Sequence, residues 1–327
     1  MDRGHQMSRY ARQILLPEVG AKGQARLASA HVLVVGAGGL AAPVLPLLAG
    51  AGIGRITIMD GDTVDLSNLH RQTLFTEADC GRPKADVAAD RCRALNSETD
   101  IIARKQSLTS KNAASVVAQA DVILDCADSY AASYILSDTC LGQDKPLISA
   151  SVLGLSGYVG GFCGGAPSLR ALFPDAPDSG ASCATAGVLG PVVGAIGAMQ
   201  AQMALNLLLG FGPSPLGQMV QYDARTLHSS GFRFDDAPEP NRCFRFLSAN
   251  QLMDDDQIID LRDVDEAPTP AHPRAERISP EDLNKIDPNN GKRLALCCAT
   301  GLRAWRAAEQ VQLNWPGEIV LVAASTS

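Results

Sequence analysis

The segment Val32-Leu33-Val34-Val35-Gly36-Ala37-Gly38-Gly39-Leu40-Ala41 decides the fold of this 327-residue chain. A short apolar run is followed by a glycine-rich turn and a helical pattern, which predicts a strand, a tight turn and the start of a helix. Backbone N–H groups at such a helix start point at a phosphate. The turn by itself is a weak indication of a dinucleotide site, and its candidate binding residues are Gly36, Gly38 and Gly39.

Strand and helix patterns alternate on both sides of this segment. We expect strands at 31–35, 55–59, 101–106, 121–125 and 146–150. The helices expected between them cover 39–51, 83–95, 110–119 and 130–142. This alternation predicts an α/β fold with a Rossmann-like, doubly wound and mostly parallel sheet. Residues 157–162 and 218–222 predict antiparallel additions to that sheet, and the apolar stretch 188–209 predicts a buried helix.

A polar, proline-containing linker at 235–247 divides the chain. The length exceeds the usual size of one domain, so we expect two domains. Residues 1–240 form the nucleotide-binding domain in this interpretation. Residues 248–327 are expected to form a smaller α/β domain, with strands at 257–262, 293–297 and 318–323 and a helix at 301–312.

Composition narrows the range of functions. The net charge is −7 and no basic stripe is present, so we expect no nucleic-acid binding. The nine cysteines include no Cys-x-x-Cys pair, which argues against a structural zinc site. Residues 1–11 are polar and lack the apolar segment of a signal peptide, and we expect no membrane span. A cytoplasmic protein with reduced thiols is therefore predicted.

A second block, Asp60 to Gln72, changes the interpretation of the glycine turn. Asp60 ends the second expected strand, 24 residues after Gly36, where a Rossmann-type carboxylate accepts hydrogen bonds from a ribose. Asn68, Arg71 and Gln72 follow at a place where a hydride-transfer enzyme has no need of them. A site for a triphosphate uses such groups, because an arginine can donate to two phosphate oxygens at once.

Three further charged residues are candidates for the same site. Lys84 is expected to open a helix, and Arg12 is another cation; both would offset the charge that develops when a triphosphate is cleaved. Asp128 follows the fourth expected strand, at the edge where doubly wound sheets bind ligands. Its carboxylate is a suitable ligand for Mg²⁺, and the alternative role is a helix N-cap.

Residues 8–235 resemble the ThiF/MoeB/HesA family, which is related to the ubiquitin-activating enzymes. The segments that carry the resemblance are Arg9–Ile14, the glycine turn, Asp60–Gln72, Gly81–Lys84, Asp125–Asp128 and Thr185–Pro191. The resemblance implies that the chain binds ATP and Mg²⁺ and adenylates the C-terminal Gly-Gly carboxylate of a small ubiquitin-like sulfur carrier. It also implies a homodimer in which Arg12 reaches into the site of the second copy.

The chain departs from this family at two places. The family's paired Cys-x-x-Cys motifs correspond to Ser168–Leu172 and to a segment that keeps only Cys243, so we predict no zinc site. The family pattern Asp-Asn-x-x-x-Arg is changed to Asp128-Ser129-Tyr130-Ala131-Ala132-Ser133, which removes the asparagine and the arginine. We still expect adenylation. The loss of the asparagine and the arginine is expected to affect either the efficiency of adenylation or the identity of the acceptor.

Two cysteines are candidates for sulfur chemistry. The resemblance implies that Cys183 can attack the acyl-adenylate or carry sulfur, since a thiolate is a strong nucleophile near neutral pH. The alternative is a small buried residue at a helix start. Cys298 opens the segment Cys298–Arg303 after an expected strand, where backbone N–H groups would surround its sulfur and stabilise a thiolate or persulfide.

The segments around Cys298 resemble a shortened rhodanese domain over about residues 248–327. Ile258–Asp263 and His272–Ala275 contribute to that resemblance. It implies that Cys298 carries a sulfane sulfur, and a cysteine desulfurase is a candidate sulfur donor. The alternative is a degenerate domain kept for docking.

The leading hypothesis is an ATP-dependent adenylyltransferase coupled to sulfur transfer for thiamine, molybdopterin or related cofactor biosynthesis. An NAD-dependent oxidoreductase is an alternative that the glycine turn and Asp60 allow, but it has no use for Asn68–Gln72 or Asp128. A non-catalytic protein that docks the sulfur carrier is the second alternative, and Ser129 and Ser133 motivate it.

Overall fold

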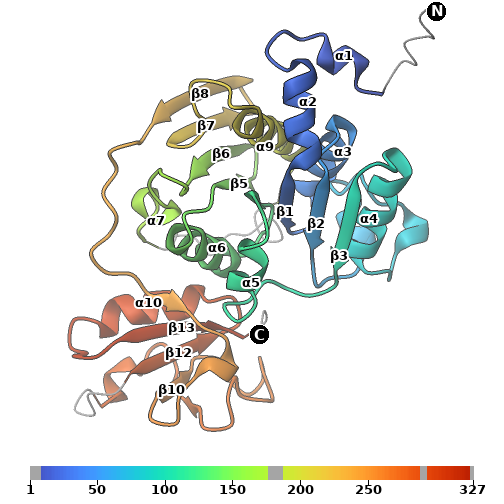
Figure 1. Cartoon of the computed structure of the whole chain (residues 1–327). Helices are drawn as coiled ribbons and strands as arrows, with labels where there is room; N and C mark the ends of the chain where they lie inside the picture. The colour runs from blue at the N-terminus through green and yellow to red at the C-terminus, as the bar shows by residue number, and fades with distance from the viewer. Residues whose placement is uncertain (1–8, 176–186, 288–292, 325–327) are drawn as a thin grey trace, which may run out of the picture.

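The computed structural model describes residues 9–175, 187–287 and 293–324, which form two α/β units (Figure 1). The larger unit contains an eight-stranded sheet in the order β3-β2-β1-β4-β5-β6-β7-β8. The smaller, C-terminal unit contains a five-stranded sheet in the order β11-β10-β12-β13-β9. The predicted α/β class is confirmed.

Five parallel strands form the half of the large sheet that contains the glycine turn. Their bounds are β1 His31–Val35, β2 Arg55–Met59, β3 Asp100–Arg104, β4 Val122–Asp125 and β5 Leu147–Leu153. All their pairings are parallel, as predicted. Parallel strands need crossover connections. These contain α3 Ala41–Ala51, α4 Lys84–Leu95, α5 Ala113–Val117 and α6 Tyr130–Gly142.

Short elements surround this core. Two helices precede β1, namely α1 Ala11–Ile14 and α2 Gly20–Ser29. Two 3₁₀ turns follow β2, namely η1 Leu66–Asn68 and η2 Glu77–Asp79. Four of the five residues of β1 and of β2 are buried, because helices cover both faces of the parallel half.

Three antiparallel strands extend the sheet beyond β5. They are β6 Ser156–Phe162, β7 Gln218–Asp223 and β8 His228–Arg233, with helix α7 Leu169–Leu172 after β6. The antiparallel pairing of β6 and β7 agrees with the prediction. The sequence did not predict β8, because all six of its residues are exposed and no apolar alternation marks them as a strand.

The apolar stretch forms the 20-residue helix α9, Gly190–Leu209. Among the described residues it is the one helix long and apolar enough to cross a membrane. It packs against α3, β5 and β6 inside the large unit, which is the buried position predicted from the sequence.

The small unit is an all-parallel sheet with one main helix. Its elements are β9 Arg245–Phe246, η3 Ala249–Gln251, β10 Gln257–Asp260, β11 Glu276–Arg277, η4 Leu283–Lys285, β12 Leu294–Cys298, α10 Leu302–Val311 and β13 Ile319–Ala323. All four strand pairings are parallel. Cys297 and Cys298 face opposite sides of this sheet, and Cys298 belongs to the apolar cluster that contains Trp305 of α10.

The small unit lies against α5 and α6 of the large unit (Figure 1). The ring of Trp305 lies 4.8 Å from that of Tyr134 on α6, between centroids, and the ring of Phe246 lies 6.5 Å from Tyr134. The hydroxyl groups of Ser110 and Ser248 are 3.1 Å apart across the same contact. One continuous apolar cluster therefore joins the two units.

Candidate nucleotide site and sulfur loop

The topology brings the loops after β1 and β4 together. The chain leaves β1 toward β2 and leaves β4 toward β5, so the two connections run in opposite directions from neighbouring strands. Doubly wound sheets bind ligands at such a switch point. Gly36 has a φ of +90°, and a Cβ atom there would lie 2.6 Å from the carbonyl oxygen of Cys126. Only glycine can occupy this position, because the two loops touch.

The second predicted block lies directly over the glycine turn. A Cβ atom on Gly39 would lie 3.5 Å from Cγ of Arg71, and one on Gly38 would lie 3.6 Å from Nε2 of Gln72. Gln72 is 4% exposed, and its Nε2 donates to Oδ1 of Asn68 at 3.2 Å. Its Oε1 has no hydrogen-bond partner. A buried unpaired amide oxygen needs a donor, which a bound ligand would supply.

Asp60 joins the glycine turn to the loop after β2. One carboxylate oxygen accepts the N–H of Ala37 at 2.7 Å, and the other accepts the N–H of Asp62 at 2.7 Å. Burial raises the pKa of Asp60, and these two backbone hydrogen bonds act in the opposite direction. Lys84 is buried, opens α4 as predicted, and places its Nζ 3.0 Å from Oδ2 of Asp62. Asp60 and Lys84 are thus connected through Asp62 beside the glycine turn.

Asp128 is exposed in the loop between β4 and α6. The N-cap of α6 is Ser129, so Asp128 does not occupy the capping position that was its alternative role. In the part of the chain that the structure describes, no three His, Cys, Asp or Glu side chains are grouped to hold a metal ion. One carboxylate is nevertheless enough for Mg²⁺ where phosphates supply further oxygens.

Two predicted residues are not among those that meet here. Cys183 lies outside the described residues. Arg12 is exposed on α1, and its neighbour Tyr10 packs against Gly52, where a Cβ atom would lie 2.5 Å from Cε1 of the tyrosine. Gly52 follows the C-terminal end of α3, whose other end adjoins the glycine turn. An 11-residue helix is about 16 Å long, so Arg12 belongs to the opposite end of the sheet.

Cys298 lies at the end of β12, in a loop that surrounds its sulfur with donors. The Sγ atom is buried and accepts the N–H groups of Gly301 at 3.1 Å and of Ala304 at 3.3 Å. Helix α10 begins directly after Gly301, so its N-terminal dipole favours negative charge at this loop. Arg303 forms an ion pair with the side chain of Glu266. The loop has the donor geometry that the sequence predicted for a thiolate or persulfide.

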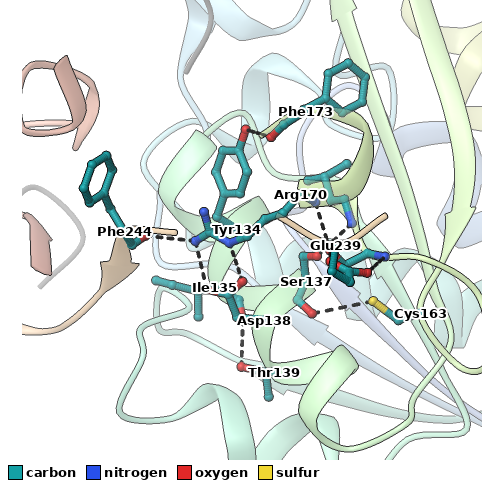
Figure 2. Close-up of polar contacts among 12 residues, drawn as sticks. Tyr134, Ile135, Ser137, Asp138, Thr139, Cys163, Arg170, Phe173, Glu239 and Phe244 are labelled. Atoms are coloured by element: carbon teal, nitrogen blue, oxygen red, sulfur yellow. Dashed lines mark hydrogen bonds and ion pairs between the residues drawn. The ribbon is translucent and has the colours of Figure 1, made fainter. Parts of the chain in front are cut away.

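A polar contact that the sequence did not predict fastens residues 239–244 to α6 and α7 (Figure 2). The backbone N–H and the hydroxyl of Ser168 both donate to the carboxylate of Glu239 at 2.6 Å. Arg170 donates through Nε and Nη2 to the two oxygens of Asp138 at 2.6 and 2.9 Å, and Nη2 also donates to the carbonyl of Phe244 at 3.0 Å. We call these contacts, which join Ser168 to Glu239 and Arg170 to Asp138 and Phe244, the Arg170 clasp.

The guanidinium of the clasp also lies over two aromatic rings. Its central carbon is 4.6 Å from the centroid of Tyr134 and 5.4 Å from that of Trp305. Ser168 and Arg170 fall in the segment where the resembled family has its first cysteine pair. No zinc is needed for the contacts that the clasp makes, and the absence of a zinc site stays a prediction.

Residues 10–243, which include the glycine turn and the Asp60–Gln72 block, match the ThiF family. The chain belongs to this family. A relative in Culex quinquefasciatus, named adenylyltransferase and sulfurtransferase MOCS3, is 42% identical over 232 residues, which are 70% of this chain and 52% of that protein. The chain thus spans about half the length of several curated relatives.

Two other relatives align differently. The MOCS3 protein of Anopheles gambiae is 38% identical over 317 residues, which cover 90% of this chain and 71% of the relative. An alignment of that extent includes part of the small unit. The sulfur carrier protein adenylyltransferase of Thermus thermophilus is 41% identical over 227 residues, which cover 67% of this chain and 84% of the relative.

Solved structures share the fold of the large unit. E. coli MccB has a TM-score of 0.64 at 21% identity, over 75% of this chain and 74% of that chain. PaaA has a TM-score of 0.60 at 22% identity, over 71% of this chain and 75% of that chain. The Rossmann-like, doubly wound architecture predicted from the sequence is confirmed.

Proposed function

We propose that the chain is an ATP-dependent adenylyltransferase for the C-terminal carboxylate of a small, ubiquitin-like sulfur carrier that ends in Gly-Gly. One observation carries the proposal: Arg71 and Gln72 pack on the glycine turn at the switch point of the sheet. A cation therefore adjoins the helix start at which a phosphate would bind. Membership of the ThiF family and the names of the relatives support this function.

The residues at the switch point suit ATP. The N–H groups of the glycine turn would donate to phosphate oxygens, and the remaining lone pairs of Asp60 would accept the ribose hydroxyls. Asn68 and Gln72 are the amides beside the turn, and the unpaired Oε1 of Gln72 needs a donor. Asp128 would hold Mg²⁺, which neutralises phosphate charge when it is bound.

The proposed reaction is an attack of a carrier carboxylate oxygen on the α-phosphorus. A new bond forms between that oxygen and the α-phosphorus, the bond from the α-phosphorus to the oxygen that bridges the α- and β-phosphates breaks, and pyrophosphate and the acyl-adenylate are the two products. Negative charge grows on the phosphate oxygens during this step. Arg71 and Lys84 stabilise that charge, since fixed cations cost no reorganisation at the moment of reaction.

We further propose a homodimer in which Arg12 serves the site of a second copy. The position of Arg12 at the far end of its own sheet supports this assignment, because the side chain cannot reach its own glycine turn. The resemblance stated above gives the same role to this arginine.

The small unit has a separate proposed role in sulfur transfer. The terminal sulfur of a Cys298 persulfide, which a cysteine desulfurase would supply, attacks the acyl carbon and AMP leaves. The product is an acyl disulfide between carrier and Cys298. A second thiol, for which Cys183 is the candidate, then forms a disulfide with Cys298 and releases the thiocarboxylate. The donors around the sulfur of Cys298 support this role.

The direct test is exchange of labelled pyrophosphate into ATP. The chain is mixed with ATP, Mg²⁺ and a candidate carrier, and a carrier that lacks its last glycine is the control. We expect exchange that requires Mg²⁺ and the intact Gly-Gly end. Binding of a carrier without exchange, and without a thermal shift on adding ATP and Mg²⁺, would favour the non-catalytic docking protein.

A further inference from the structure

A glutamine lies fully buried in the middle of the apolar helix α9. The side chain of Gln200 is 0% exposed, and its Nε2 donates to the carbonyl oxygens of Asp125 at 2.7 Å and Ile148 at 3.0 Å. Its Oε1 accepts the thiol hydrogen of Cys126 at 3.3 Å. The amide therefore bonds both to the last residue of β4 and to the first residue of the loop that leads to Asp128.

The carboxylate of Asp125 continues this buried group. It is 0% exposed, and it accepts the hydroxyl of Ser149 at 2.8 Å and the N–H of Ala127 at 3.2 Å. Ser149 is its direct neighbour on β5. The Ser133 hydroxyl, on the first turn of α6, acts to lower the pKa of this carboxyl group. The start of the loop between Asp125 and Asp128 is thus held from α9 and β5.

The same helix contacts the other loops of the proposed site. A Cβ atom on Gly190, at the start of α9, would lie 2.6 Å from the carbonyl oxygen of His70, next to Arg71. A Cβ atom on Gly197 would lie 2.4 Å from the carbonyl oxygen of Leu40, at the end of the glycine turn. Helix α9 therefore contacts the arginine segment, the glycine turn and, through Gln200, the loop after β4.

We propose that Gln200 is a positioning residue, which acts with Asp125 to set the backbone of Cys126 and Ala127 and thereby the placement of Asp128 at the nucleotide site. The inference rests on the proposed function for the role of Asp128. Groups that orient a metal-binding carboxylate affect metal affinity even though they never touch the metal.

The test compares two glutamines on the same helix. Gln200→Met keeps the volume but removes all three hydrogen bonds, whereas Gln202→Met removes an exposed glutamine that bonds to Asn206. The rate of pyrophosphate exchange is measured against Mg²⁺ and ATP concentration. We expect Gln200→Met to raise the half-saturating Mg²⁺ concentration about tenfold. We expect Gln202→Met to match the wild type.

A second readout does not depend on activity. Hydrogen exchange of the peptide 125–130 reports whether the Ala127 amide is still held. We expect Gln200→Met to speed exchange in this peptide while β1 and β2 stay protected. Ser149→Ala, which removes one bond to Asp125, should act in the same direction with a smaller effect, and it replaces Gln200→Met if that variant does not fold.

The outcomes separate the two proposals. Equal Mg²⁺ dependence in Gln200→Met and wild type, or loss of protection spread evenly over the sheet, would overturn the positioning role. A wild-type chain that catalyses no exchange would overturn the proposed function. In that case the hydrogen-exchange comparison alone decides whether Gln200 holds the loop.

Discussion

Arg71 is the residue on which the proposed chemistry depends most directly. Its side chain passes over Gly39, and its Nη1 lies 2.9 Å from Nε2 of His70. It has no carboxylate partner among the ion pairs of the described residues. Its charge is therefore not offset by a carboxylate of the described residues, whereas the charge of Lys84, the second cation of the proposed site, is partly offset by its ion pair with Asp62.

Replacing Arg71 should reduce catalysis without affecting folding. We expect Arg71→Ala to lower the rate of pyrophosphate exchange about 100-fold, because a preorganised cation at the developing charge is lost. Arg55→Ala, which removes an exposed arginine paired with Asp100, is the matched control. Steady-state exchange rates and melting temperatures check this; a normal rate in Arg71→Ala would contradict the assignment.

Asp125 predicts a pH dependence of stability. Burial raises the pKa of its carboxyl from 3.8 to about 6, partly opposed by Ser133, Ser149 and Ala127, while the charge of Asp128 raises it further. The folded state thus holds a proton that the unfolded state has lost between these pH values, so stability falls as pH rises from about 4 to about 6.

The neutral variant Asp125→Asn should escape this loss. We expect its free energy of unfolding to rise relative to wild type between pH 4 and pH 7, by at most about 3 kcal/mol. Urea unfolding at several pH values measures the difference. If the difference in free energy of unfolding between Asp125→Asn and the wild type became smaller as pH rises, burial of the Asp125 charge would not destabilise the fold.

At the scale of elements, the Arg170 clasp connects α6, α7 and the segment that leads to β9. Its guanidinium is buried, pairs with both oxygens of Asp138, and lies over Tyr134 and Trp305. Because Trp305 belongs to α10, the clasp also contacts the small unit. A direct polar contact of this kind needs no metal, yet the buried guanidinium of Arg170 would lose its counter-charge if Asp138 were removed.

Removing the contacts of the Arg170 clasp should therefore lower the stability of the folded chain. We expect Arg170→Met to lower the free energy of unfolding by about 2 kcal/mol, because the hydrogen bonds to Asp138 and Phe244 and the cation over the two rings are lost. Arg233→Met, which removes an exposed pair with Asp235, should change it by less than about 1 kcal/mol. Denaturant titrations compare the two variants, and equal losses would count against a stabilising clasp.

At the scale of the whole molecule, the position of α1 separates Arg12 from the site of its own chain. A side chain at the far end of the sheet can serve catalysis only in another copy. In a symmetric dimer each site would then combine Asp128 of one chain with Arg12 of the other.

Mixing variants tests this arrangement. Arg12→Ala and Asp128→Ala chains should each be nearly inactive alone. After random reassociation, half of the dimers are mixed and one of their two sites is intact, so we expect about a quarter of wild-type exchange activity. Absence of any recovery, with mixed dimers present by native mass spectrometry, would exclude shared sites.

The sequence determined the parallel sheet, the glycine turn and the acidic strand end by itself. The bounds of β1 and β2 agree with those predicted, because buried strands carry apolar runs that glycine-rich turns interrupt. Asp60, Arg71 and Lys84 are candidates on similar grounds, since each follows or opens an element with a local signature.

The tertiary structure alone decided which distant residues meet. Gln200 lies 75 residues from Asp125, and Glu239 lies 71 residues from Ser168. Such pairs depend on how α9 and the linker pack on the sheet, and no local pattern encodes that packing. The strand β8 follows the same rule, because its pairing with β7, and not an apolar alternation of its own, makes it a strand.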